Sequence, residues 1–243
     1  PVMNASASTS LALADYGDLY YFFKRHLIFA CVALGAAFCA LWIPVRVWLQ
    51  LSWPLLLLGL VLLALVFVPG IGHEVNGSRR WLKLGFFTLQ SSEFAKLFMV
   101  IFIAGYLVRH RDELQKKLLA FVRPLIVLSI FLVLVYLEPD FGASTVMFGS
   151  VAIMIFLAGT SLKVAWMFLA VLVPLGVIAM VQEDYRMERL LSFMNPWDDQ
   201  FGTGYQLSQS LIAFGRGEWF GLGLGNSIQK QFYLPEAHTD FVF

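Results

Sequence analysis

Apolar stretches of membrane-crossing length recur from one end of this sequence to the other. A helix needs about 20 mainly apolar residues to span a bilayer, and flanking Trp, Tyr, Lys and Arg can extend a shorter stretch to the interface. The pattern predicts an all-α polytopic membrane protein, a helical bundle of about seven spans of which the first is partial. The predicted spans are the partial Pro1–Leu13, then Leu27–Ile43, Pro54–Pro69, Phe94–Val108, Pro124–Leu137, Phe141–Leu157 and Val164–Val181.

Charged residues are too scarce for the surface of a soluble domain. They make up 14% of the 243 residues, whereas 59% are apolar, and soluble domains carry about 25% charged residues. Soluble, disordered, collagen-like and disulfide-scaffold classes are therefore excluded. The net charge is +1 and no extended basic patch is present, so we expect no nucleic-acid partner.

The short loops differ in their positive charge. Those around residues 45–50, 109–123 and 159–163 carry seven Lys/Arg, against five in the short loops on the other side. The more basic side is expected to be cytoplasmic. The opposite side then carries Gly70–Ser92, the Glu138–Asp140 corner and residues 182–243. We interpret 1–243 as one integral membrane domain, with 182–243 as a large extracytoplasmic loop that enters the next span. The apolar start and the ending HTDFVF lead us to expect a chain truncated at both ends.

Glu93 and Lys96 share one face at the start of an apolar helix because they are three residues apart. Charges at membrane depth are costly and usually mark a paired or functional site. One interpretation is a substrate-facing pair in a polar cavity. The other is an interfacial ion pair whose helix is capped by Ser91 and Ser92.

Three further motifs carry groups suited to chemistry. In NGSRRW, the guanidinium of Arg80 suits a phosphate or carboxylate, while Trp81 and its arginines could equally anchor the membrane interface. In EPDFG, Asp140 is placed to cap the following helix, a structural role. In LPEAHTDF, Asp240 follows His238 and enters an apolar segment, which favours a raised pKa and a role as base. No zinc-ligand spacing or nucleotide-binding motif is evident, so we expect no cofactor, although a divalent cation stays open.

These motifs together resemble the SEDS family (shape, elongation, division and sporulation). The resemblance rests on NGSRRWLKLGFFTLQSSEFAKL, EPDFG, the run from RLLSFMNPWDDQ to GLGLGNSIQK, and YLPEAHTDF. The NPW and GYQL-x-QSL segments resemble the division-type members more than the elongation-type members. The family often has Pro where this chain has Ser91. The resemblance implies a ten-span fold, of which this chain covers most of seven spans and the large outer loop.

The same resemblance implies an inverting peptidoglycan glycosyltransferase that polymerises lipid II on the periplasmic side of the bacterial inner membrane, at the division septum. It assigns Asp240 as the catalytic acid group and places Glu93 and Lys96 in the substrate cavity. The implied partners are lipid II and the nascent glycan strand, membrane lipid, a class B penicillin-binding protein (an FtsI-like transpeptidase), and small bitopic division proteins of the FtsQ, FtsL and FtsB type.

The chemistry suits one carboxylate and several cations. The acceptor hydroxyl needs a general base, whereas the pyrophosphate leaving group needs positive charge and no proton. We expect Asp240 to act as the base and the Trp81 ring to form an apolar wall of the substrate site. The predicted substrate-binding set is Arg80, Trp81, Glu93, Lys96, Arg186, Arg189, Gln206, Ser210, Lys230 and His238. A lipid II flippase and a non-catalytic division scaffold remain as alternatives. Transporters usually show inverted repeats, and none is evident here.

Overall fold

The computed structural model divides the chain into two compact units, residues 1–42 with 175–243, and residues 43–174. Each unit is described by itself. The described residues are 12–13, 16–75, 78–84, 87–116, 118–159, 166, 170, 173–174, 176–178, 181, 184–223, 226–229 and 233–234.

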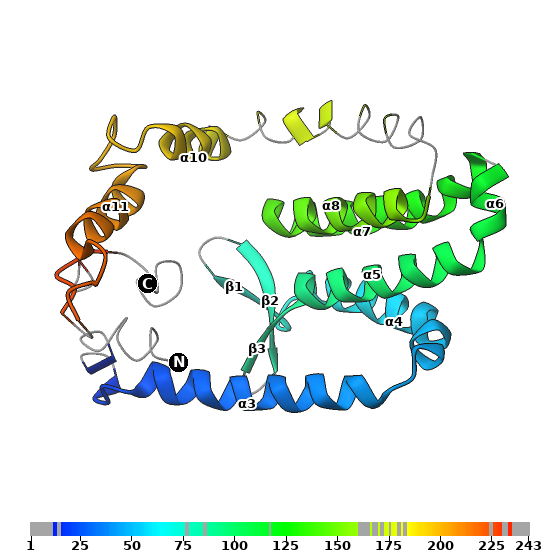
Figure 1. Ribbon diagram of the computed structural model, residues 1–243, viewed down its shortest axis with the longest axis horizontal. Coiled ribbons are helices and arrows are strands. Elements are labelled where there is room, and N and C mark those ends of the chain that lie inside the picture. Colours follow the sequence, from blue (N-terminus) through cyan, green and yellow to red (C-terminus); the bar gives the residue numbers. More distant parts are fainter. Residues whose placement is uncertain are drawn as a thin grey trace. The chain divides into compact units, whose positions relative to one another are not determined.

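Among the described residues, the unit of residues 43–174 contains a bundle of apolar helices (Figure 1). Helix α5 (Ser91–Arg109) is its centre, since it packs against α4 (Val45–Val66), α7 (Val122–Leu137) and α8 (Phe141–Leu157). Two short elements, α6 (Arg111–Lys116) and the 3-10 helix η1 (Leu118–Phe121), connect α5 to α7.

The bundle core is made by apolar side chains that recur on one face of each helix. Phe102 on α5, Phe131 on α7 and Met147 on α8 are almost completely buried and belong to one cluster. The outward faces are also apolar, as Ile130 and Ile153 illustrate with 48% and 60% exposure. Apolar surface on both faces of a helix is typical of helices that contact lipid.

Small residues let α4 and α5 approach closely. A Cβ added at Gly59 of α4 would lie 3.3 Å from the rings of Phe98 and Phe131 and 3.6 Å from the Cα of Ala95. A Cβ added at Gly105 of α5 would lie 3.4 Å from the Cβ of Ser52. Small residues at helix interfaces are the usual device for close packing in membranes, and here they fix the position of α5.

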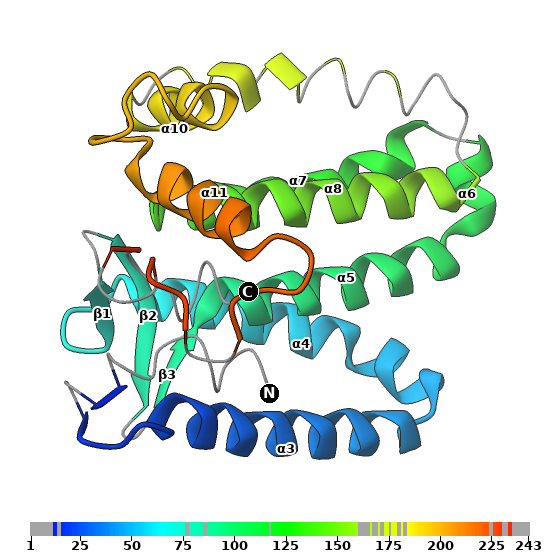
Figure 2. The ribbon, with the colours of Figure 1, turned by 60° about the vertical axis from the view of Figure 1, so that its left-hand side comes forward.

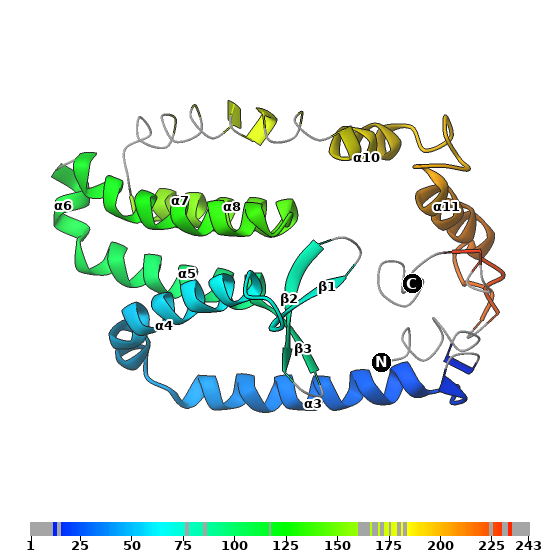
Figure 3. The same cartoon turned by 180° about the vertical axis from the view of Figure 1, so that it is seen from behind.

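A three-stranded antiparallel sheet lies between α4 and α5 in the sequence (Figures 2 and 3). Its strands are β1 (Gly72–Val75), β2 (Ser78–Leu84) and β3 (Phe87–Gln90), in the order β1-β2-β3. Strand β3 ends at Gln90 and α5 begins at the next residue, so the sheet sets the direction in which α5 enters the bundle. The helical fold class is confirmed, and the sheet was not predicted.

The other unit contains α3 (Tyr21–Trp42), α10 (Asp184–Met194) and α11 (Tyr205–Gly217). None of the α3 residues is buried within the protein, although its apolar composition is that of a membrane helix. Between α10 and α11, the Asp199 carboxylate accepts hydrogen bonds from the backbone N–H of Thr203 (2.8 Å) and from its hydroxyl (3.2 Å). The loop predicted over 182–243 therefore contains helical structure.

The predicted spans overlap the described helices, but the predicted loop 45–50 is wrong because α4 already begins at Val45, and α4 ends at Val66 rather than at Pro69. Helices α3, α4 and α5 are long and apolar enough to cross a membrane, and α7 and α8 are shorter apolar helices. Most of the predicted span Pro1–Leu13 and more than half of Val164–Val181 lie outside the described residues. The fold is that of a multi-pass membrane protein.

Candidate active site

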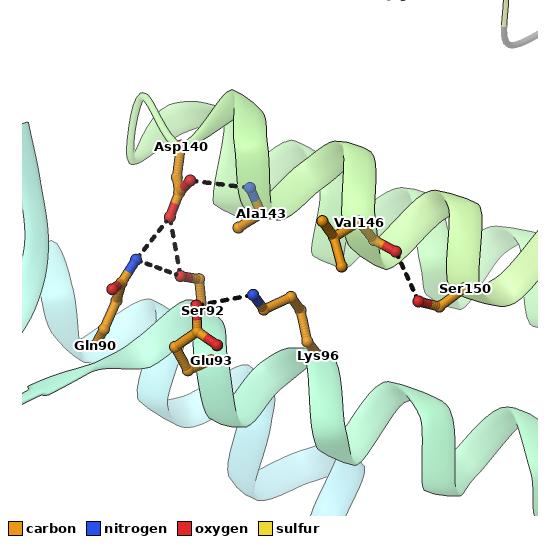
Figure 4. A network of polar contacts seen from close by, with 8 residues as sticks. All are labelled: Gln90, Ser92, Glu93, Lys96, Asp140, Ala143, Val146 and Ser150. Carbon is orange, nitrogen blue, oxygen red and sulfur yellow. Dashed lines mark hydrogen bonds and ion pairs between the residues drawn. The ribbon is translucent and has the colours of Figure 1, made fainter. Parts of the chain in front are cut away.

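Glu93 and Lys96 form an ion pair in the first turns of α5. The Lys96 Nζ atom lies 2.8 Å from the Glu93 Oε1 atom. The Lys96 side chain is only 20% exposed, whereas that of Glu93 is 57% exposed. The Lys96 side chain is therefore partly buried, and its ammonium group donates to the exposed carboxylate of Glu93 (Figure 4). An anionic oxygen that approaches from the Glu93 side can replace that carboxylate as the partner of Lys96.

The two serines before this pair do not cap α5. The N-cap residue is Gln90, which makes no side-chain capping hydrogen bond, and Ser91 and Ser92 lie within the helix. The alternative interpretation, in which Ser91 and Ser92 cap α5, is therefore wrong about the cap. Their hydroxyl groups instead donate to two carboxyl groups at the corner between α7 and α8, because the bundle brings that corner against the start of α5.

The Ser91 hydroxyl donates to the carboxyl group of Glu138. The Ser91 Oγ atom lies 3.2 Å from Oε1 and 3.1 Å from Oε2, and both residues have no solvent-exposed surface. Glu138 lies at the corner, after the last residue of α7. Burial raises the pKa of the Glu138 carboxyl to about 8. The Ser91 hydrogen bond lowers this pKa, the charge of Asp140 raises it, and the charge of Arg80 lowers it.

Asp140 makes the second connection. Its Oδ2 atom accepts hydrogen bonds from Ser92 Oγ (3.0 Å) and Gln90 Nε2 (2.9 Å), while Oδ1 accepts from the backbone N–H of Ala143 (3.0 Å). The predicted capping of α8 by Asp140 is confirmed. Figure 4 shows Gln90 and Ser92 on one side of this carboxylate and Ala143 on the other. One side chain therefore both caps α8 and holds the start of α5.

We call Gln90, Ser91, Ser92, Glu138 and Asp140 the corner clamp. It fixes the first turn of α5 against the α7–α8 corner, directly before Glu93 and Lys96. Lys96 lies four residues after Ser92 on the same helix, about one turn further along, so the clamp also fixes where Lys96 lies. Sequence reasoning missed Gln90 and the pairing role of Glu138. The available signal was a pair of acids at a Pro corner, directly after an apolar span.

Arg80 and Trp81 lie on β2 and point to opposite faces of the sheet, since successive strand residues alternate. The Arg80 Nε atom donates to Ser78 Oγ at 3.0 Å, and the charge of Arg80 acts on Glu138. Trp81 pairs with His73 on β1 and with Gln90 on β3. The charge of Arg80 therefore acts on the corner clamp through Glu138, while Trp81 lies beside the strand that leads into α5.

The remaining predicted site residues lie in the other unit. Arg189 on α10 is exposed, Gln206 on α11 is half-buried, and Ser210 on α11 is buried with 4% exposure. The described residues do not include the predicted site residues Lys230, His238 and Asp240. For Arg186 they include the backbone but not the side chain. Among the described residues, no group of three or more His, Cys, Asp or Glu side chains is arranged to hold a metal ion.

Comparison with known proteins gives a consistent result along the chain. A "Probable peptidoglycan glycosyltransferase FtsW" of Pseudomonas fluorescens is 51% identical over 243 residues, which are 100% of this chain and 60% of that protein. A protein of the same name from Coxiella burnetii is 47% identical over 245 residues, covering 65% of its length. The chain thus spans about 60% of the length of curated relatives that it matches.

Two solved structures are similar in fold. A chain of the structure described as "Structural coordination of polymerization and crosslinking by a peptidoglycan synthase complex" is 30% identical, with a TM-score of 0.63 over 87% of this chain and 60% of that one. The rod shape determining protein RodA of Thermus thermophilus is 28% identical, with a TM-score of 0.55 over 71% of this chain and 56% of RodA. The family described as "Cell cycle protein", FtsW/RodA/SpoVE, matches residues 1–243. The predicted SEDS resemblance is thereby confirmed, and the chain belongs to this family of cell cycle proteins.

Proposed function

We propose that the full-length protein is a peptidoglycan glycosyltransferase that polymerises lipid II during septal cell-wall synthesis. The observation that carries this proposal is the match of the whole chain to relatives of that name, at 51% identity in the Pseudomonas protein. The geometry adds a partly buried lysine side chain, Lys96, paired with the exposed carboxylate of Glu93 at the start of an apolar helix. Such a group suits an anionic, membrane-anchored substrate such as a lipid pyrophosphate.

The proposed reaction needs one base. The acceptor sugar hydroxyl attacks the anomeric carbon of the donor, and its proton passes to the carboxylate of Asp240. The bond from that carbon to the pyrophosphate oxygen breaks, and undecaprenyl pyrophosphate leaves with the electron pair. General-base catalysis contributes about 10²–10⁴-fold to such a step. The leaving group needs no proton, so a second carboxylic acid is not required.

Lys96 and Arg80 supply positive charge for the pyrophosphate in this proposal. Lys96 exchanges Glu93 for a phosphate oxygen, and the corner clamp keeps α5 in place while it does so. Charged donors fixed before the reaction stabilise the developing negative charge without having to reorganise. The other proposed substrate contacts are Trp81, Arg186, Arg189, Gln206, Ser210, Lys230 and His238.

The protein is proposed to reside in the bacterial inner membrane at the division septum, with its active site facing the periplasm. The excess of Lys/Arg in the loops remote from the corner clamp supports this orientation. Proposed partners are a class B penicillin-binding protein, an FtsI-like transpeptidase, and small bitopic division proteins of the FtsQ, FtsL and FtsB type. The similarity to a chain from a peptidoglycan synthase complex supports a synthase partner.

The test uses the full-length gene product in liposomes with fluorescent lipid II, first alone and then with its class B penicillin-binding protein. Glycan polymer resolved on gels and its digestion by a muramidase give one readout. Accessibility of lipid II to an external enzyme gives transbilayer movement as the second. The proposal expects polymer. Transbilayer movement of lipid II without polymer would refute the proposal and favour a flippase. If neither activity is detected with the partner present, the proposal is refuted in favour of a scaffold.

A further inference from the structure

A cavity of about 280 Å³ lies at the opposite end of α5 from the corner clamp. It is lined by Trp53 of α4, by residues of α5 and the His110 that follows it, and by Arg123 and Val127 of α7. Lys96 and Arg109 are 13 positions apart on α5, which corresponds to about 20 Å along the helix. The cavity is therefore separate from the candidate active site, and nothing in the proposed reaction uses it.

Aromatic rings form most of the cavity wall and hold one another in place. The Trp53 and Phe102 rings meet edge to face with centroids 4.8 Å apart. The Tyr106 and His110 rings are stacked at 4.3 Å. The Tyr106 hydroxyl also donates to the carbonyl oxygen of Ala120 at 2.7 Å. The wall is thus apolar and preformed, which suits a hydrocarbon chain.

Two arginines, Arg109 and Arg123, lie at this wall. Arg109 donates to the Leu49 carbonyl oxygen (2.9 Å) and to Ser52 Oγ (3.1 Å), which uses two of its five N–H donors. The Arg123 guanidinium lies at the Tyr106 hydroxyl. Within the described part of the chain, neither arginine forms an ion pair with an acid, and this includes Glu113 of nearby α6. Both guanidinium groups are exposed and retain donors for an anion.

We propose that this cavity binds an anionic phospholipid, with part of one acyl chain against the aromatic wall and the phosphate on Arg109 and Arg123. Basic pockets between membrane helices commonly take such headgroups. The volume is slightly below the roughly 300 Å³ at which small-ligand pockets begin, so it suits a chain segment rather than a whole lipid. The apolar wall distinguishes a lipid from free phosphate, which would gain nothing from the rings.

The test measures lipid retention by native mass spectrometry and thermal stabilisation of the full-length gene product in a zwitterionic detergent. Phosphatidylglycerol, phosphatidylcholine and inorganic phosphate are added separately. The proposal expects phosphatidylglycerol alone to be retained and to stabilise. Arg123→Gln should weaken phosphatidylglycerol binding about fivefold, whereas Arg111→Gln, a neighbouring exposed arginine that does not line the cavity, should leave it unchanged.

A second pair of variants tests the cavity without changing charge. Val127→Trp should fill it and abolish retention of phosphatidylglycerol. Val133→Trp, on the 58%-exposed outer face of the same helix, should not. The proposal is overturned if phosphatidylcholine is retained equally, if inorganic phosphate alone gives the stabilisation, or if the two arginine variants behave alike. Retention by Val127→Trp at the wild-type level would overturn it as well.

Discussion

The hydroxyl of Ser91 and the carboxyl group of Glu138 meet in a completely buried contact between residues 47 positions apart in the sequence. Ser91 is the first residue of α5, and Glu138 directly follows α7. A buried carboxyl without a hydrogen-bond partner is costly, so this contact specifies how α5 sits against the α7–α8 corner. Lys96 follows less than two turns later. The position of Lys96, the proposed pyrophosphate-binding residue, therefore depends on the Ser91–Glu138 hydrogen bond, which the substrate need not touch.

Ser91→Ala is expected to destabilise the protein. It removes the donor to Glu138 and leaves a buried carboxyl group unsatisfied, at a cost of about 1–3 kcal/mol. For a chain of this size, that corresponds to a fall in Tm of roughly 2–12 °C. Thermal unfolding in detergent checks it. The matched control is Ser150→Ala, because the Ser150 hydroxyl only donates to Val146 of its own helix, at 2.8 Å. Equal Tm values for the two variants would refute the role of the Ser91–Glu138 contact.

Glu138→Gln is expected to change how stability depends on pH. The pKa of Glu138 is about 8 in the folded protein, against an ordinary value of 4.5. Between these values the folded state binds a proton that the unfolded state does not, so this carboxyl lowers stability progressively as pH rises from 4.5 through 8. Gln keeps a neutral group of similar shape and does not titrate.

The measurement is the Tm of both proteins from pH 4.5 to pH 9. The Tm of Glu138→Gln minus that of the wild type should increase toward pH 8 and then level off, because the other titrating groups are common to both. A difference that does not vary with pH would show that Glu138 titrates alike in the folded and unfolded states.

Lys96→Met is expected to lower the rate of lipid II polymerisation by about 10²–10³-fold, because it removes one preorganised cation from the leaving group. Stability should change little, since ion pairs with an exposed member contribute about 0–1 kcal/mol. Lys83→Met is the matched control, as Lys83 is an exposed lysine on β2. Polymerisation at the wild-type rate by Lys96→Met would remove Lys96 from the reaction.

The sequence predicted the helices well because an apolar run in a membrane protein has few other stable conformations. It did not predict the sheet. On the charge pattern, Gly70–Ser92 lies on the outer side, and Arg79, Arg80 and Lys83 count among the charges of a short loop. A hairpin signal was nevertheless present, because Asn76-Gly77 stands between Val75 and Ser78, which pair across β1 and β2.

The candidate site was predicted in part. The Glu93–Lys96 pair follows from helical periodicity, and the Asp140 cap follows from its position before an apolar helix. Contacts such as Ser91 with Glu138 depend on how α5 packs against α7 and α8, which no local pattern encodes. Ser91 and Ser92 have the residue type of helix caps, and tertiary packing directed their hydroxyl groups elsewhere.

The most direct test of the proposed activity is polymerisation of fluorescent lipid II by Asp240→Asn in the full-length gene product, together with its class B penicillin-binding protein. Asp198→Asn, which changes an exposed acid of the same loop, is the control. The account predicts wild-type glycan polymer from the control and a rate at least about 10²-fold lower from Asp240→Asn, with unchanged Tm. Wild-type polymerisation by Asp240→Asn would contradict the assignment of Asp240 as the base.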